Sequence, residues 1–193
     1  MLPRLGASKL VSTWLLLLLT ASVVAMVDGG WLASWTALAP QRIWRGEVWR
    51  LVTWALVEDA PSSLLLTCFC IYRFGGDLAP RWGDRRLRRF AVLVILAAAA
   101  LTTLAALASR DALYLSRTAG WAICDALTIA WARQYPTAHL RLYGLVELGG
   151  QRLVLITVGI TVIYAIASGP FFMLPELVAC LAAAYCPRAW LAR

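Results

Sequence analysis

The sequence TWLLLLLTASVVAMV occupies residues 13–27 and contains no charged side chain. The whole 193-residue chain continues this pattern, with 62% hydrophobic and only 15% charged residues. Soluble domains carry roughly 45–50% apolar and about 25% charged residues, so this composition excludes a soluble globular enzyme. It also excludes a disordered chain, because disordered chains are poor in apolar residues. The sequence therefore predicts a polytopic membrane protein.

A short basic head precedes residues 13–27, as in a signal peptide. Five further apolar runs follow, and the residues 28–31 make a poor cleavage site, so we expect a retained helix. Six transmembrane helices are predicted, at residues 13–27, 62–74, 90–108, 120–131, 153–167 and 171–185. Several are shorter than the roughly 20 residues that a lone spanning helix needs. We therefore expect an all-α bundle of six helices that forms one domain over residues 1–193. In this bundle, neighbouring helices shield the ends of the short ones from lipid.

The formal net charge of +8 comes from basic residues that lie between the apolar runs. The segment after the second run holds six arginines against two aspartates, whereas residues 28–61 hold three arginines against four acidic residues. Basic loops stay on the cytoplasmic side. We therefore expect cytoplasmic termini, an external segment 28–61 and a bacterial inner membrane as the location. The same distribution argues against nucleic acid as a partner.

Residues 28–61 are rich in tryptophan, with indoles at Trp31, Trp35, Trp44, Trp49 and Trp54. Charges interrupt this segment too often for it to span a membrane. Indoles favour the headgroup level of a bilayer, which predicts short amphipathic pieces lying in the membrane interface. A simple aromatic anchor explains the same pattern.

The five cysteines lie in or beside apolar runs, where free cysteine acts as a small hydrophobic residue. The single histidine, His139, lies in a polar segment, and no cysteine pair has the spacing of a zinc site. We predict no disulfide, no metal site and no cofactor.

Several segments together resemble the rhomboid proteins and derlins. Residues 46–53 (GEVWRLVT) are similar to the first-loop Trp-Arg-Leu-hydrophobic-Thr segment of that family, and Trp82-Gly83 resembles its second loop. Tyr135-Pro136 and residues 140–143 (LRLY) resemble its later cytoplasmic loop, and residues 176–183 (ELVACLAA) resemble its last span. The resemblance covers residues 44–185 and implies a rhomboid-like helical bundle whose first loop lies sideways in the membrane.

Active rhomboids cut transmembrane helices with a serine–histidine dyad, and the resemblance maps each catalytic position onto this chain. Ala119 stands at the nucleophile position and Glu176 at the histidine position. The two positions that support the oxyanion are occupied by Ser63 and Thr67. Since a nucleophile needs a base and an oxyanion needs donors, the resemblance implies a pseudoprotease and not an enzyme.

Two acidic residues lie within the predicted spans, where ionisable groups are costly and often functional. In the fold that the resemblance implies, Glu176 faces the cavity. Two roles are open there: an acid that contacts a ligand or client protein, or a structural acid. Asp125 lies about 240° around its helix from Ala119, away from that cavity. A structural or interhelical hydrogen bond is favoured there over a contact with a partner.

The function predicted is the binding of transmembrane helices of partner proteins, either as a client-binding pseudoprotease or as a subunit of a larger membrane complex. The expected docking face lies between the second and fifth spans, or those residues only pack inside the bundle. An active intramembrane protease with a non-standard site, or a small membrane transporter, is the alternative. The candidate binding residues are Trp44, Trp49, Arg50, Thr67, Asp125, Thr161 and Glu176.

Overall fold

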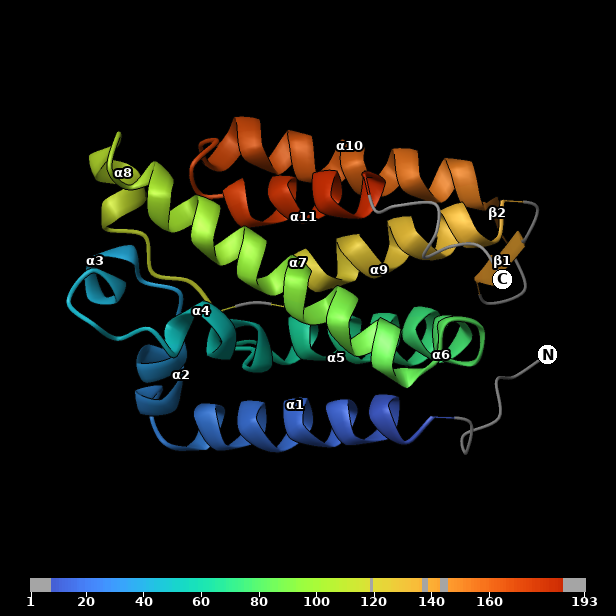
Figure 1. Cartoon of the computed structure of the whole chain (residues 1–193), viewed down its shortest axis with the longest axis horizontal. Helices are drawn as coiled ribbons and strands as arrows, with labels where there is room; N and C mark the ends of the chain where they lie inside the picture. The colour runs from blue at the N-terminus through green and yellow to red at the C-terminus, as the bar shows by residue number, and fades with distance from the viewer. Residues whose placement is uncertain (1–7, 119, 137–138, 143–145, 186–193) are drawn as a thin grey trace.

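The computed structural model describes residues 8–118, 120–136, 139–142 and 146–185. The long helices are α1 (Lys9–Val27), α7 (Asp84–Ala105), α9 (Trp121–Gln134) and α10 (Gly150–Ser168). Helices α1, α9 and α10 extend roughly along the long axis of the molecule, whereas α7 runs obliquely to it (Figure 1). The chain is thus an all-α membrane protein, as expected, apart from one small hairpin described below.

Helix α1 contains the leucine-rich run and begins at a side-chain cap. The Oγ atom of Ser8 accepts a hydrogen bond from the backbone N–H of Val11. The same hydroxyl donates to Asp84 at 2.8 Å and so joins the start of α1 to the start of α7. Leu16 and Val23 are 62% and 51% exposed. Large exposed aliphatic side chains of this kind suit contact with lipid tails.

The tryptophan-rich segment forms four short helices, as the broken apolar pattern predicts. These are α2 (Trp31–Thr36), α3 (Pro40–Ile43), α4 (Arg50–Thr53) and η1 (Trp54–Leu56). Proline suits the first turn of α3 because the missing N–H has no helical partner there. The four pieces gather at one end of the molecule (Figure 1).

The next helical segment is continuous but changes its winding. It comprises α5 (Pro61–Cys70), the π-helical turn η2 (Ile71–Gly75) and α6 (Gly76–Trp82). It lies at 95° to Arg50–Leu56. Gly83 ends it with a φ of +77°, a conformation that glycine adopts at little cost.

Helix α9 forms the centre of the bundle. Every residue from Ala122 to Ala132 is buried, and α5, α7, α10 and α11 (Leu174–Ala184) pack around it. Short α8 (Arg110–Leu113) follows α7. Between α9 and α10, β1 (His139–Leu142) pairs antiparallel with β2 (Val146–Gly149). This hairpin replaces part of the loop expected there.

The number of spans differs from the six predicted. Three helices of the described chain, α1, α7 and α10, are long and apolar enough to cross a membrane, and a fourth span results if the bent segment Arg50–Leu56 plus Pro61–Trp82 is counted once. Helices α9 and α11 have 14 and 11 residues. They therefore reach only about 21 and 17 Å, less than the roughly 30 Å hydrocarbon core.

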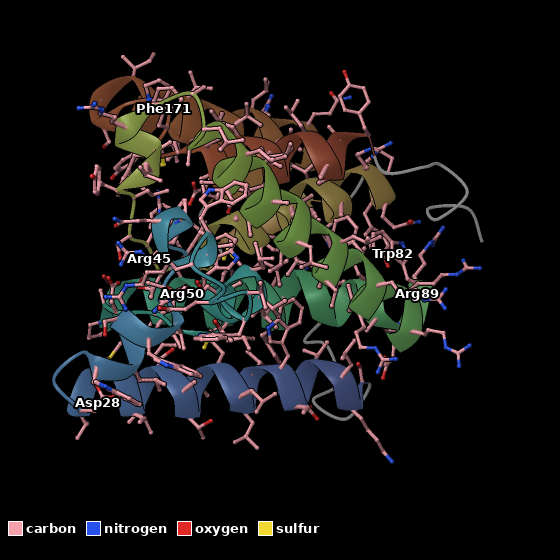
Figure 2. All side chains as sticks on the ribbon, turned by 60° about the vertical axis from the view of Figure 1, so that its left-hand side comes forward. Asp28, Arg45, Arg50, Trp82, Arg89 and Phe171 are labelled. Carbon is pink, nitrogen blue, oxygen red and sulfur yellow. The ribbon has the colours of Figure 1, made fainter. Side chains whose placement is uncertain are left out.

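The two ends of the bundle differ in composition. Figure 2 shows Trp82 and Arg89 at one end, and Arg45, Arg50 and Phe171 at the other. The first end holds the arginine run that begins α7, and the second holds the tryptophan-rich helices. This polarity along the helix axes is the arrangement expected of a membrane protein with two chemically different interfaces.

Candidate functional site

An apolar cavity lies between α5 and α10, with α9 and α11 as its other walls. Its volume is about 520 Å³, within the range of typical small-ligand pockets. Leu66 and Phe69 come from α5, and Ile160 and Tyr164 come from α10. Leu66 and Ile160 are 43% and 44% exposed, so the cavity is open along this side. We call it the apolar cavity.

Asp125 lines the apolar cavity from α9. Its Oδ2 atom accepts a hydrogen bond from the Thr161 hydroxyl of α10 at 2.9 Å, and the Cys180 thiol of α11 lies 3.7 Å away. Helical phase predicted that Asp125 points away from the cavity, but the structure places it in the cavity wall. The interhelical hydrogen bond favoured for Asp125 from the sequence is nevertheless present, because Thr161 of α10 donates to it.

Glu176 lines the same cavity from α11 and is 1% exposed. Its Oε1 atom lies 2.8 Å from Nη2 of Arg117. The other terminal nitrogen of Arg117 donates to the Phe172 carbonyl at 2.6 Å, and the guanidinium stacks 4.5 Å from the Phe172 ring. Glu176 is therefore paired with Arg117, which sequence reasoning did not single out.

A second, polar chamber of about 490 Å³ adjoins this ion pair. Its walls include Glu58, Asp59 and Ser63, together with hydroxyl groups from Ser34, Ser62, Ser116 and Thr118. Arg117, Trp121 and Phe172 line both the polar chamber and the apolar cavity. The two spaces therefore meet at these three residues.

Glu58 is fully buried and connects three parts of the chain. Its Oε1 atom accepts hydrogen bonds from the Thr67 hydroxyl at 2.6 Å and from the backbone N–H of Gly120 at 2.7 Å. Its own N–H donates to Ser22 of α1. Its Oε2 atom has no hydrogen-bond partner among the described residues. Sequence reasoning missed Glu58, because it counted this residue as one of the loop charges.

Gly120 lies in a space that has no room for a side chain. A Cβ atom there would lie 2.6 Å from Cγ2 of Thr67 and 2.8 Å from the Glu58 carboxylate. Such distances are shorter than van der Waals contact, so this close approach of α9 to α5 requires glycine. Ala119, which precedes it, lies outside the described residues.

The other residues predicted at the site are spread over two regions. Thr67 is fully buried and bonded to Glu58, and Ser63 donates to the Ala60 carbonyl. Thr161 is buried, whereas Trp44 and Trp49 are 52% and 38% exposed. The two tryptophans lie in the short-helix segment and do not line the apolar cavity.

Arg50 is fully buried in this short-helix segment. Its guanidinium donates to the carbonyls of Ser34 and Ala37 at 2.8 and 2.9 Å, and to Glu47 at 2.6 Å. It therefore holds the end of α2 against the start of α4.

Three indoles form a stack on the same segment. The ring centroids of Trp31 and Trp35 are 6.3 Å apart, and those of Trp35 and Trp49 are 5.2 Å apart. The Trp49 indole N–H also donates to the Trp35 carbonyl. The stack is a partly exposed aromatic surface at the tryptophan-rich end of the bundle.

Within the described ranges, no group of three or more His, Cys, Asp or Glu residues is arranged to hold a metal ion. Cys68, Cys70, Cys124 and Cys180 are free thiols; Cys186 lies outside the described residues.

Residues 9–188 match a protein family described as "Eukaryotic integral membrane protein (DUF1751)". No curated protein matches the sequence. The match covers nearly the whole chain and agrees with the membrane-spanning helices, so the lipid bilayer is a partner of this chain. The expected location in a bacterial inner membrane is wrong, because the family is eukaryotic. Loop charges report the two sides of a membrane and not the kind of cell.

Proposed function

The chain belongs to this eukaryotic family of integral membrane proteins, and from that premise we propose that it is a rhomboid-like pseudoprotease that binds transmembrane helices of other proteins at the apolar cavity. The observation that carries the proposal is the opening between α5 and α10. Helices α5 and α10 correspond to the second and fifth predicted spans. In the rhomboid fold that the sequence resembles, these two spans flank the substrate entrance.

The packing of α10 supports this binding face. Helix α10 packs on α9 and α11, and only 17% of its most apolar stretch is buried. Leu155, Ile163 and Ile166 are 72%, 65% and 80% exposed. A helix so weakly covered has apolar surface available for a second helix. Thr157 and Gly159 permit the close approach on which helix association in membranes depends.

In the bundle that we propose, the short helices α9 and α11 lie inside, among the longer helices. Helix α9 is surrounded by its neighbours, and α11 packs on α7 and α9. In such a rhomboid-like arrangement, neither helix needs to cross the bilayer alone, because longer helices shelter both ends.

The site also supports the proposal that the protein lacks protease activity. The N–H of Gly120 follows position 119, where the resemblance places the nucleophile, and this N–H donates to the Glu58 carboxylate. An N–H group that already donates a hydrogen bond to a carboxylate is not free to stabilise a developing oxyanion. Serine-directed fluorophosphonate labelling of the purified protein tests this directly. Labelling above that of a heat-denatured sample would overturn the proposal.

Helix binding is tested with photo-crosslinking residues in the full-length protein in its membrane. Leu66 and Ile160 line the cavity, and Leu101 on α7 serves as the control because its exposed fraction of 48% matches theirs. We expect crosslinks to membrane proteins from the two cavity positions at several times the yield from Leu101. Equal yields at the three positions would contradict the proposal.

Purification of the crosslinked products in mild detergent separates the two forms of the function. One stoichiometric partner identifies a subunit of a membrane complex, for which the exposed stack of Trp31, Trp35 and Trp49 offers an additional assembly surface. Many substoichiometric membrane proteins identify a client-binding role.

A further inference from the structure

The apolar cavity and the polar chamber are adjoining spaces of different chemistry. The cavity of about 520 Å³ is walled by side chains such as Leu66, Phe69 and Ile160. The chamber of about 490 Å³ holds the charged and hydroxyl groups. Arg117, Trp121 and Phe172 line both spaces, so the cavity and the chamber adjoin at these side chains. A ligand with its chain in the cavity and its polar end in the chamber would lie across them.

Acidic side chains outnumber basic ones in the described lining of these spaces. Four described acidic side chains line them, namely Glu58 and Asp59 in the chamber and Asp125 and Glu176 in the cavity. The described lining contains one basic side chain, Arg117. It forms an ion pair with Glu176, donates to the Phe172 carbonyl and covers the Phe172 ring. Arg117 is therefore already engaged and is poorly placed to receive an anion.

Glu58 lines the chamber and carries a buried acceptor that has no hydrogen-bond partner among the described residues. The side chain is fully buried, and this acceptor is its Oε2 atom. A buried carboxylate oxygen without a donor is costly, and a cation close by lowers that cost. Asp59, which is exposed at the same chamber, adds a second negative charge. The aromatic faces of Trp121 and Phe172, where the two spaces meet, also favour a cation.

From this combination we propose that the site binds a single-chain amphiphile with a protonated amine head. The alkyl chain occupies the apolar cavity between α5 and α10, and the ammonium group lies in the polar chamber beside Glu58 and Asp59. A primary amine is protonated at neutral pH, as a lysine side chain is. This inference concerns a lipid-like ligand of the same apolar cavity, and its test needs no partner helix.

Three probes of equal chain length test the head group. Dodecylamine, dodecanol and dodecanoate are titrated against the full-length protein in a neutral detergent below their critical micelle concentrations, and bound ligand is counted by native mass spectrometry. We expect dodecylamine to bind at least tenfold more tightly than dodecanol, and dodecanoate more weakly than both.

Variants then test the two parts of the site. Asp59→Asn and Glu58→Gln each reduce the preference for the amine severalfold, whereas Asp84→Asn, an exposed acid at the other end of the bundle, leaves it unchanged. Asp59 is exposed, so Asp59→Asn remains informative if Glu58→Gln fails to fold. Ile160→Trp narrows the apolar cavity and weakens all three probes by the same factor.

The inference is overturned by any of four results. The first is equal affinity for the three probes, which indicates an apolar cavity alone. The second is tightest binding of dodecanoate, which makes Arg117 the head-group site. The third is no saturable binding of any probe. The fourth is an amine preference that survives both Asp59→Asn and Glu58→Gln.

Discussion

The backbone N–H of Gly120 and the carboxylate of Glu58 meet at 2.7 Å, although 62 positions separate them in the chain. The same carboxylate oxygen accepts the Thr67 hydroxyl at 2.6 Å. This single atom therefore joins the start of α9, the middle of α5 and the segment that connects η1 to α5. The contact therefore holds Glu58 in place in the wall of the polar chamber.

Replacing Glu58 by alanine is expected to lower the free energy of unfolding by about 2–4 kcal/mol. The variant loses two hydrogen bonds to a carboxylate and leaves two buried donors without an acceptor. Glu58→Gln keeps an acceptor oxygen and is expected to lose less than half of that amount. Thermal unfolding in detergent, followed by loss of monodisperse protein, measures both variants. Equal stability of Glu58→Ala and the wild type would contradict the contact.

Gly120→Ala is expected to destabilise the protein by about 2 kcal/mol or more, because its Cβ would overlap Thr67 and Glu58 and force the helices apart. Gly159 on α10 supplies the matched control, since a Cβ there meets nothing within 4 Å. Gly159→Ala should raise stability by up to about 1 kcal/mol through its helix propensity. Opposite signs for the two variants in one thermal unfolding series are the expected result. A common sign would count against the close approach at Gly120.

The helices were predictable from sequence because long apolar runs such as residues 13–27 have few alternatives to a helix in a membrane. The polar site was not predictable in the same way. Glu58 and Arg117 look like ordinary loop charges, and their partners lie 62 and 59 positions away. The resemblance marked Thr67 and Glu176 as positions of interest but gave neither partner. The predicted number of six transmembrane helices was wrong because α9 and α11 are apolar but too short to cross a membrane alone.

The hydrogen bond between Thr161 and Asp125 is expected to couple α10 to α9. Thr161→Val and Asp125→Ala should each destabilise the protein, and the double variant should lose less than the sum of the two. The coupling energy expected for a hydrogen bond between membrane helices is about 0.6–2 kcal/mol. Thr157→Val, one turn earlier on the same helix and also in the cavity wall, is the control. Strict additivity in the double-mutant cycle would show that the two helices are not coupled through this bond.

Arg50→Lys is expected to loosen the tryptophan-rich segment although the charge is retained. The planar guanidinium of Arg50 donates to Glu47 and to the carbonyls of Ser34 and Ala37 at the same time. The ammonium group of lysine is not planar and cannot make these three hydrogen bonds in the same directions. Buried polar groups left without partners cost about 1–3 kcal/mol each. The variant should therefore become sensitive to limited proteolysis within residues 28–61. Arg45→Lys is the matched control, because Arg45 is exposed in the same segment. If Arg50→Lys resists the protease as well as Arg45→Lys does, the guanidinium is not what holds α2 against α4.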